Sequence, residues 1–148
     1  MCIRDRNGRV IDVFARKNYL LGTPRDGTTE PMRQALGQRA LGLPTVLVTN
    51  ESTLSDGEDF TEGYRTLELG KVVGTPTAGW IIFTGAQRLI DGSQVRVPGD
   101  RIRDTRGQDM EMHPRPVDVE QLRPLGETET GEDVQLQKAV QTLLGQLQ

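Results

Sequence analysis

The fold is decided by the stretch TVLVTNESTLSDGEDFTEGYRTL, residues 45–67. It opens with a short run of β-branched and apolar residues, 45–49, which is typical of a strand buried on both faces of a sheet. It continues to Phe60, Tyr64 and Leu67, whose spacing places them on one face of a helix. The stretch therefore predicts a buried strand that passes into a helix, with Ser55 at the junction.

Further elements are predicted on either side of this unit. Upstream, residues 10–21 have a period of 3.6 residues and predict a helix that Pro24 stops, because proline cannot continue the ladder. A polar surface excursion is expected over 25–42, with a short helical piece at 32–38. Downstream, Gly70 is placed to end the central helix. The expected later elements are strands at 71–74, 80–83, 88–90 and 94–97, an extended segment within 110–119, and a helix from about Asp133.

Two local signals support the downstream elements. Asp91-Gly92 predicts a hairpin closed by a type I′ turn. Thr130 and Asp133 have the spacing of a capping box, and the helix after them carries one apolar stripe. Buried strands that alternate with crossover helices predict an α/β fold. The stripe consists of Leu136, Val140, Leu143, Leu144 and Leu147.

Composition excludes several classes of function. The chain has 148 residues and a net charge of −3, from 18 basic and 21 acidic side chains, so no nucleic-acid partner is expected. No apolar run approaches the ~20 residues that cross a bilayer. Cys2 is the only cysteine, and no His/Cys cluster has metal-binding spacing, so neither a metal nor a cofactor is expected.

The first residues need separate treatment. Residues 1–6, MCIRDR, resemble the translation of a sequencing adapter, and such scars do not belong to the fold. The alternative is a genuine charged N-terminus. On the adapter hypothesis the natural protein begins upstream, and the domain occupies 7–148. The compartment stays unknown, with the cytoplasm favoured.

Ser55 is where the chemistry is expected. A serine at a strand-to-helix junction exposes its hydroxyl beside the free N–H groups of the first helical turn, which can stabilise an oxyanion. The structural alternative is a helix N-cap, with Glu58 completing a capping box. On this local pattern alone, the cap is the favoured interpretation.

Four ordered motifs reverse that preference. The stretch 46–60 resembles the strand, Asn-Glu and Ser-Asp-Gly-Asp-x-Phe pattern of tricorn-type serine peptidases of the C-terminal-processing peptidase clan. Residues 69–79, 89–92 and 131–140 are similar to later motifs of that family. The resemblance covers about 7–148 and implies a crotonase/ClpP-like ββα-superhelix catalytic domain, incomplete at the N-terminus. It also implies an upstream β-propeller and a PDZ-like domain.

The resemblance assigns roles to particular residues. It implies that Ser55 is the nucleophile, that the N–H of Asp56 is an oxyanion donor, and that Glu111 is the acid that orients a second serine. For substrate binding it implies two glycines. Gly57 belongs to the same motif, and Gly8 would be a remnant of the loop that supplies the second oxyanion donor in the family. Asp26, with Glu30 in the same loop, would favour basic substrate side chains; a solvated loop is the alternative.

The general base is missing from this pattern. In the family, the base and the second serine lie upstream of the nucleophile, in a region absent here. The turn 77–81 lacks the lysine of the clan's Ser–Lys enzymes. His113, the only histidine, shares the face of Glu111 along a strand, but a half-exposed loop histidine is the commoner case. The chain alone is therefore expected to be inactive.

The implied function is a serine endopeptidase or oligopeptidase that acts on peptides or unfolded proteins through an acyl-enzyme. The resemblance leaves a homo-oligomer open. Two alternatives are a non-catalytic peptide-binding module on the same fold, and a crotonase-like acyl-CoA enzyme that does not need Ser55.

Overall fold

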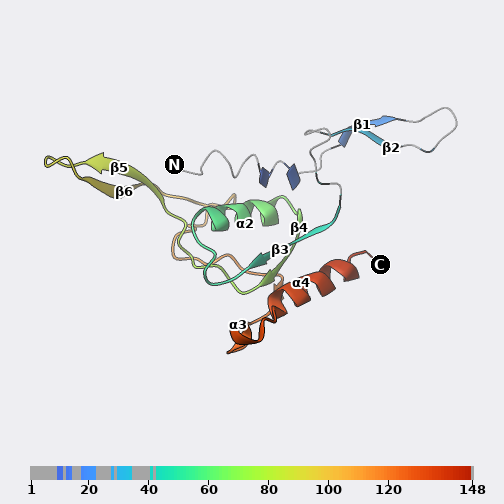
Figure 1. Cartoon of the computed structure of the whole chain (residues 1–148). Coiled ribbons are helices and arrows are strands. Elements are labelled where there is room, and N and C mark those ends of the chain that lie inside the picture. The colour runs from blue at the N-terminus through green and yellow to red at the C-terminus, as the bar shows by residue number, and fades with distance from the viewer. Residues whose placement is uncertain are drawn as a thin grey trace.

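The structure is a computed structural model, which describes residues 10–11, 13–14, 18–22, 28, 30–34, 41 and 43–147 (Figure 1). Val10, Ile11, Val13 and Phe14 are helical. The remaining elements, in chain order, are β1 (Asn18–Gly22), β2 (Glu30–Gln34), β3 (Thr45–Thr49), α2 (Asp56–Thr66), β4 (Gly70–Gly74), β5 (Phe83–Arg88), β6 (Gln94–Asp100), β7 (Val119–Glu120), α3 (Glu127–Thr130) and α4 (Val134–Gly145). None of the described helices is long and apolar enough to span a membrane.

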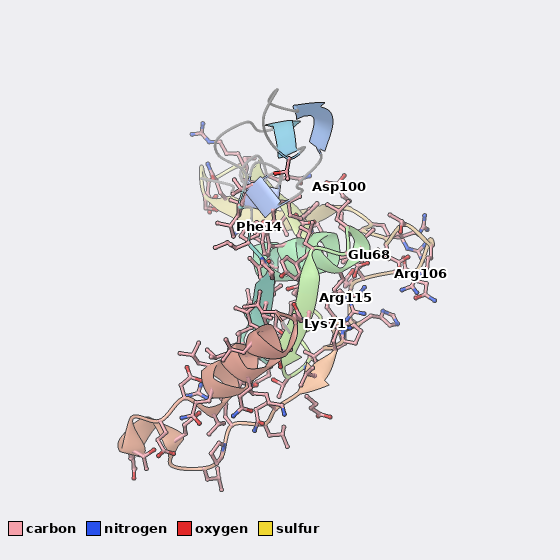
Figure 2. All side chains as sticks on the ribbon, turned by 90° about the vertical axis from the view of Figure 1, so that its right-hand side faces the viewer. Phe14, Glu68, Lys71, Asp100, Arg106 and Arg115 are labelled. Atoms are coloured by element: carbon pink, nitrogen blue, oxygen red, sulfur yellow. The ribbon has the colours of Figure 1, made fainter. Side chains whose placement is uncertain are left out.

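A three-stranded parallel sheet, in the order β3-β4-β7, carries the site. β3 and β4 pair in register from Thr45 with Gly70 to Thr49 with Gly74, and α2 is the crossover that parallel pairing requires. Figures 1 and 2 place α2 on one side of β3 and β4 and α4 on the other. The chain therefore enters α2 at the carboxyl edge of the sheet, which is where ligands bind in open α/β sheets.

The core lies between this sheet and its two helices. Val72 and Val73 of β4 are fully buried, and Tyr64 of α2 is 1% exposed. The Tyr64 hydroxyl bonds to Oγ1 of Thr45 at 2.8 Å. Gly70 permits this contact, because a Cβ atom there would lie 2.3 Å from the Tyr64 hydroxyl and 2.2 Å from the Thr45 carbonyl oxygen. These contacts fix α2, and with it Ser55, against the sheet.

The predicted strand 45–49 and the helix after it are confirmed, with two corrections. β3 is an edge strand in the described sheet, and its two faces are not both buried: Thr49 is buried, whereas Val48 is 40% exposed. Gly70 does not end α2, since Leu67 is its C-cap and Gly70 already begins β4. Glu68, with φ of 52°, makes the left-handed turn that glycine was expected to make.

The prediction for the N-terminal region is partly wrong. Residues 10–21 do not form one helix, because Asn18–Gly22 is strand β1. The helical piece expected at 32–38 is also wrong where the structure describes it, since β2 runs to Gln34. β1 and β2 pair antiparallel, so each satisfies the backbone groups of the other. A helical period over so short a stretch does not outweigh that pairing.

The predicted hairpin is confirmed with different bounds. β5 and β6 pair antiparallel from Phe83 with Asp100 to Arg88 with Gln94, and the hairpin projects from the body of the molecule (Figure 1). Residues 80–82 are not in a strand. The type I′ turn is wrong, because only Gly92 (φ 85°) has positive φ in that loop. The longer loop, closed by the Leu89 N–H on the Ser93 carbonyl, needs only one such residue.

The C-terminal helix begins where predicted but faces differently. Asp133 is the N-cap of α4 and accepts the Leu136 N–H, while Thr130 ends the separate helix α3, so the predicted capping box is wrong. The buried positions of α4 are Gln135 and Ala139. Gln135 donates to the Gln121 carbonyl at 2.9 Å, which sets the rotation of α4. Most of the predicted apolar stripe is exposed as a result: Leu136, Val140, Leu144 and Leu147.

Candidate active site

The junction between β3 and α2 is a tight turn. The side chain of Thr53 accepts the N–H of Asn50 at 3.1 Å, and the side chain of Asn50 accepts the N–H of Ser52 at 2.9 Å. Both bonds fold the chain back on itself within a few residues. Ser55 thus follows β3 through a compact turn rather than a loose loop.

Ser55 has a strained backbone. It is the N-cap of α2, and Glu58 forms a capping box with it, as the structural interpretation expected. An ordinary N-cap lies in the β region, however, and Ser55 has φ 52° and ψ −117°. Such a conformation costs about 1–3 kcal/mol in a residue with a side chain, and it occurs at strand-to-helix turns that present a nucleophile. A capping role alone does not require it.

The Glu58 carboxylate is the structural centre of the site. It is 1% exposed and accepts four hydrogen bonds. Its Oε2 accepts the N–H of Ser55 at 3.0 Å and the N–H of Trp80 at 2.7 Å. Its Oε1 accepts the Thr77 hydroxyl at 2.7 Å and the N–H of Gly79 at 2.5 Å. The start of α2 is therefore joined to the segment that follows β4.

Thr77 and Gly79 extend this connection to the segment that contains Glu111. The Thr77 hydroxyl accepts the N–H of Arg115 at 2.7 Å, and the Gly79 carbonyl accepts the N–H of Met112 at 2.8 Å. Gly79 has φ 79°, and a Cβ atom there would lie 3.2 Å from the backbone nitrogen of Pro114. The glycine lets the two backbones approach, so residues 111–115 lie beside the Ser55 turn.

The predicted catalytic residues are placed as follows. Asp56 is the first residue of α2, so its N–H lies at the positive end of that helix. Glu111 is exposed, in the turn that Met112 attaches to Gly79. His113 is also exposed, and its Nδ1 bonds to the Glu111 carbonyl at 2.8 Å. The fold thus brings Glu111 and the start of α2 to one region.

The predicted substrate-binding residues are described only in part. Gly57 lies in the first turn of α2, and a Cβ atom there would lie 3.0 Å from Cγ2 of Thr53. Its lack of a side chain therefore keeps the turn before Ser55 compact. Gly8 and Asp26 lie outside the described residues, as does the side chain of Glu30.

A second carboxylate lies at the end of β3. Glu51 accepts the Thr75 hydroxyl at 3.0 Å, which ties the turn after β3 to the end of β4. Backbone hydrogen bonding, and then the Thr75 hydroxyl, hold the pKa of Glu51 below its usual range. Glu51 is therefore an anion at neutral pH, which suits a structural acceptor better than a general base.

Two clefts of the described chain lie elsewhere. Each has a volume of about 410 Å³ and is lined by Arg65 and Glu68, at the C-terminal end of α2. Figure 2 shows Glu68 and Arg115 in this region. Two of the cations there have partners, since Arg115 pairs with Glu62 at 3.1 Å and Arg106 with Asp104 at 3.3 Å. No group of described residues could hold a metal ion.

Sequence reasoning identified Glu58 only as part of a capping box. Its tertiary role was missed, and so were those of Thr77 and Arg115. The available signal was the Glu at the third position after Ser55. The two groups that donate to Oε1 of Glu58, the Thr77 hydroxyl and the Gly79 N–H, are 19 and 21 residues away in the sequence, and no local pattern points to them.

The comparisons with known proteins agree with this geometry. Residues 5–120 match the model of peptidase family S41, so the chain belongs to that family. It is similar to the tricorn protease of Thermoplasma volcanium, at 33% identity over 109 residues, which is 63% of this chain and 10% of that protein. A tricorn protease homolog of Streptomyces coelicolor is 42% identical over 82 residues, 54% of this chain and 7% of that protein.

The solved structures give the same assignment. A crystal structure of the tricorn protease matches 95% of this chain and 14% of its own, with TM-score 0.73 and 27% identity. The photosystem II D1 C-terminal processing protease matches 79% of this chain and 31% of its own, with TM-score 0.58 and 23% identity, which shows the fold alone. The expected α/β fold and the tricorn-type assignment are confirmed. The chain spans about a tenth or less of the curated relatives' length.

Proposed function

We propose that Ser55 is the nucleophile of a serine peptidase that cleaves peptide bonds through an acyl-enzyme. The observation that carries this proposal is the backbone conformation of Ser55. Its φ of 52° and ψ of −117° lie outside the β region of an ordinary helix N-cap, so a capping role does not account for the strain. Family membership supports the reaction class, and the buried Glu58 supports a turn rigid enough to present a hydroxyl.

The proposed reaction has two steps. Oγ of Ser55 forms a bond to the substrate carbonyl carbon while a general base takes its proton; the C–N bond then breaks, and the amine leaves with that proton. Water next hydrolyses the ester and releases the acid. We assign the N–H of Asp56 to the oxyanion, because it lies in the first turn at the positive end of α2.

The base is proposed to come from outside these 148 residues. Among the described residues His113 makes no hydrogen bond to Ser55; its Nδ1 bonds to the Glu111 carbonyl and its ring is exposed. Glu111 is proposed as the acid that orients the partner of that base. This role fits its position beside the Gly79 segment, where an exposed carboxylate is accessible to a second element. Peptides or unfolded proteins are the proposed substrates.

The test is fluorophosphonate labelling of the full-length parent protein, with the adduct located by mass spectrometry. We expect one adduct, on Ser55, and none in Ser55→Ala. Ser52→Ala is the matched control, because Ser52 is an exposed serine in the same turn, and it should label like the wild type. Labelling elsewhere, or no labelling, would contradict the proposal.

The same variant separates the alternatives. Loss of one member of a nucleophile–base pair costs about as much as loss of the whole unit, so Ser55→Ala should lower peptide turnover by several orders of magnitude, up to ~10⁶. A peptide-binding module would bind peptides in both forms and hydrolyse none. A crotonase-like acyl-CoA enzyme would keep its rate in Ser55→Ala.

A further inference from the structure

Arg115 is a nearly buried cation beside the candidate site. Its side chain is 9% exposed and pairs with Glu62 of α2, where Nη1 donates to Oε2 at 3.1 Å. The same guanidinium donates twice to the carbonyl of His113, from Nε at 3.2 Å and from Nη2 at 2.8 Å. A charge so far from water needs such acceptors, because an unpaired buried charge is destabilising. Arg115 therefore joins α2 to the backbone of His113.

His113 closes the turn that carries Glu111. Its N–H donates to the Met110 carbonyl at 3.1 Å, so residues 110–113 form a β-turn with Glu111 and Met112 at its centre. Met112 has φ 62°, which a residue with a side chain adopts only at an energetic cost. A strained turn keeps its shape only when the surrounding structure holds it.

The backbone of Arg115 is fixed as well. Its N–H donates to the Thr77 hydroxyl at 2.7 Å, and its carbonyl accepts the Thr77 N–H at 3.2 Å. Pro114 and Pro116 flank it, and a proline fixes its own φ and restricts the residue before it. The guanidinium therefore extends from a rigid segment, and its planar fork holds a carbonyl and a carboxylate at the same time.

Glu62 and Ser55 belong to the same helix. Ser55 is the N-cap of α2, and Glu62 lies about two turns further along it. The connection from Ser55 to the Glu111 turn thus runs along a packed helix, across one ion pair and through the side chain of Arg115. It includes no loop, so a change in this ion pair should move the Glu111 turn relative to Ser55.

We propose that Arg115 is a positioning residue, which with Glu62 fixes the Glu111 turn relative to Ser55 so that Glu111 can orient the partner of the general base. The inference rests on the proposed function and adds a residue that acts through the Glu111 turn. A displacement of about 1 Å at a catalytic group can lower the rate about 100-fold. Loss of this anchor should therefore lower turnover more than it weakens substrate binding.

Hydrolysis of a fluorogenic peptide by the full-length parent protein tests the proposal. Arg115→Lys keeps the charge but lacks the planar fork, so kcat should fall about 10–100-fold, whereas KM should change less than about twofold. Glu62→Gln should lower kcat in the same way from the other side of the pair. Arg106→Lys is the matched control and should behave like the wild type, because Arg106 also forms an ion pair, with Asp104, but its side chain is 77% exposed.

Two further measurements separate positioning from a merely structural role. In a Glu111→Gln background, Arg115→Lys should lower kcat less than about twofold further, because residues that act as one unit are not additive. Hydrogen exchange in the peptide 110–118 of the parent protein should be about tenfold faster in Arg115→Lys than in the wild type, because the Met112 and His113 amides lose protection.

The outcomes are distinguishable. An unchanged kcat in Arg115→Lys, the same loss with and without Glu111→Gln, or unchanged hydrogen exchange would overturn the positioning role. Circular dichroism checks folding, and Glu62→Gln replaces Arg115→Lys in every comparison if the latter does not fold. If Ser55 is labelled by the fluorophosphonate but these results appear, only the positioning role fails. If Ser55 is never labelled, the proposed function fails, and faster exchange would still show that Arg115 anchors the turn.

Discussion

The backbone N–H of Ser55 donates to the buried carboxylate of Glu58, at 3.0 Å, and this bond fixes a residue whose backbone, with φ 52° and ψ −117°, is strained. The same carboxylate accepts the N–H groups of Gly79 and Trp80 and the hydroxyl of Thr77. A carboxylate with several good donors is a strong acceptor. One side chain therefore holds the candidate nucleophile, the segment after β4 and, through Gly79, the turn of Glu111.

Glu58→Gln should destabilise the protein by about 2 kcal/mol or more, because an amide group would place N–H donors against donors at one of the two oxygen positions. Urea unfolding followed by circular dichroism measures this. Phosphonate labelling of Ser55 in the parent protein should slow as well. Glu132→Gln, at an exposed position, is the control and should leave both unchanged. Equal stability of Glu58→Gln and the wild type would show that the four bonds are dispensable.

Tyr64→Ala should cost more stability than Phe60→Ala. Tyr64 is 1% exposed and bonded to Thr45, so its truncation should fall within the ~3–5 kcal/mol of buried aromatic residues. Phe60 is only half-buried and packs edge-on against Phe14, with ring centroids 5.9 Å apart, so its truncation should cost less than about 3 kcal/mol. Unfolding curves of both variants decide the order, and the reverse order would mean that α2 is rotated from its position here.

Stability should fall in acid because of Glu127, which is 4% exposed. The ion pair with Arg123, and then the N–H of Val134, hold the pKa of Glu127 below its usual range. A carboxyl with a depressed folded pKa stabilises the protein above its unfolded pKa of about 4.3 and loses that contribution as pH falls through the folded value.

Glu127→Gln should therefore lower Tm at pH 6–7, and its difference from the wild type should shrink below about pH 4. Thermal unfolding from pH 3 to 7 measures the difference. Glu129→Gln, in the same short helix at an exposed position, serves as the control. A difference that stays constant across this range would contradict the role of the charge.

The 148-residue chain by itself should not hydrolyse peptides. A serine hydroxyl needs an adjacent general base, and the only histidine, His113, is exposed and makes no hydrogen bond to Ser55 in the described part of the structure. A panel of fluorogenic peptides checks this. Turnover that both Ser55→Ala and His113→Ala abolish would make His113 the base.

The local elements around the site could be predicted because their signals are local. A β-branched run predicts β3, the 3.6-residue period predicts α2, and Asp133 begins α4. The N-terminal stretch could not be predicted in this way. Its apolar period suggests a helix, whereas pairing of β1 with β2 satisfies the same backbone groups through residues distant in sequence.

The sequence by itself determined the strand–turn–helix unit, the identity of Ser55 as the residue at its junction, and membership of the peptidase family, because each depends on residue types at short spacing. Only the tertiary structure decided that the buried Glu58 carboxylate accepts four hydrogen bonds and that one of its oxygens accepts the N–H groups of both Ser55 and Trp80. It also decided that Leu136 and Leu144 of α4 are exposed. Those facts depend on which distant backbone donors the packed sheet brings together. A hydrogen bond between residues that are distant in the sequence produces no repeating pattern of residue types.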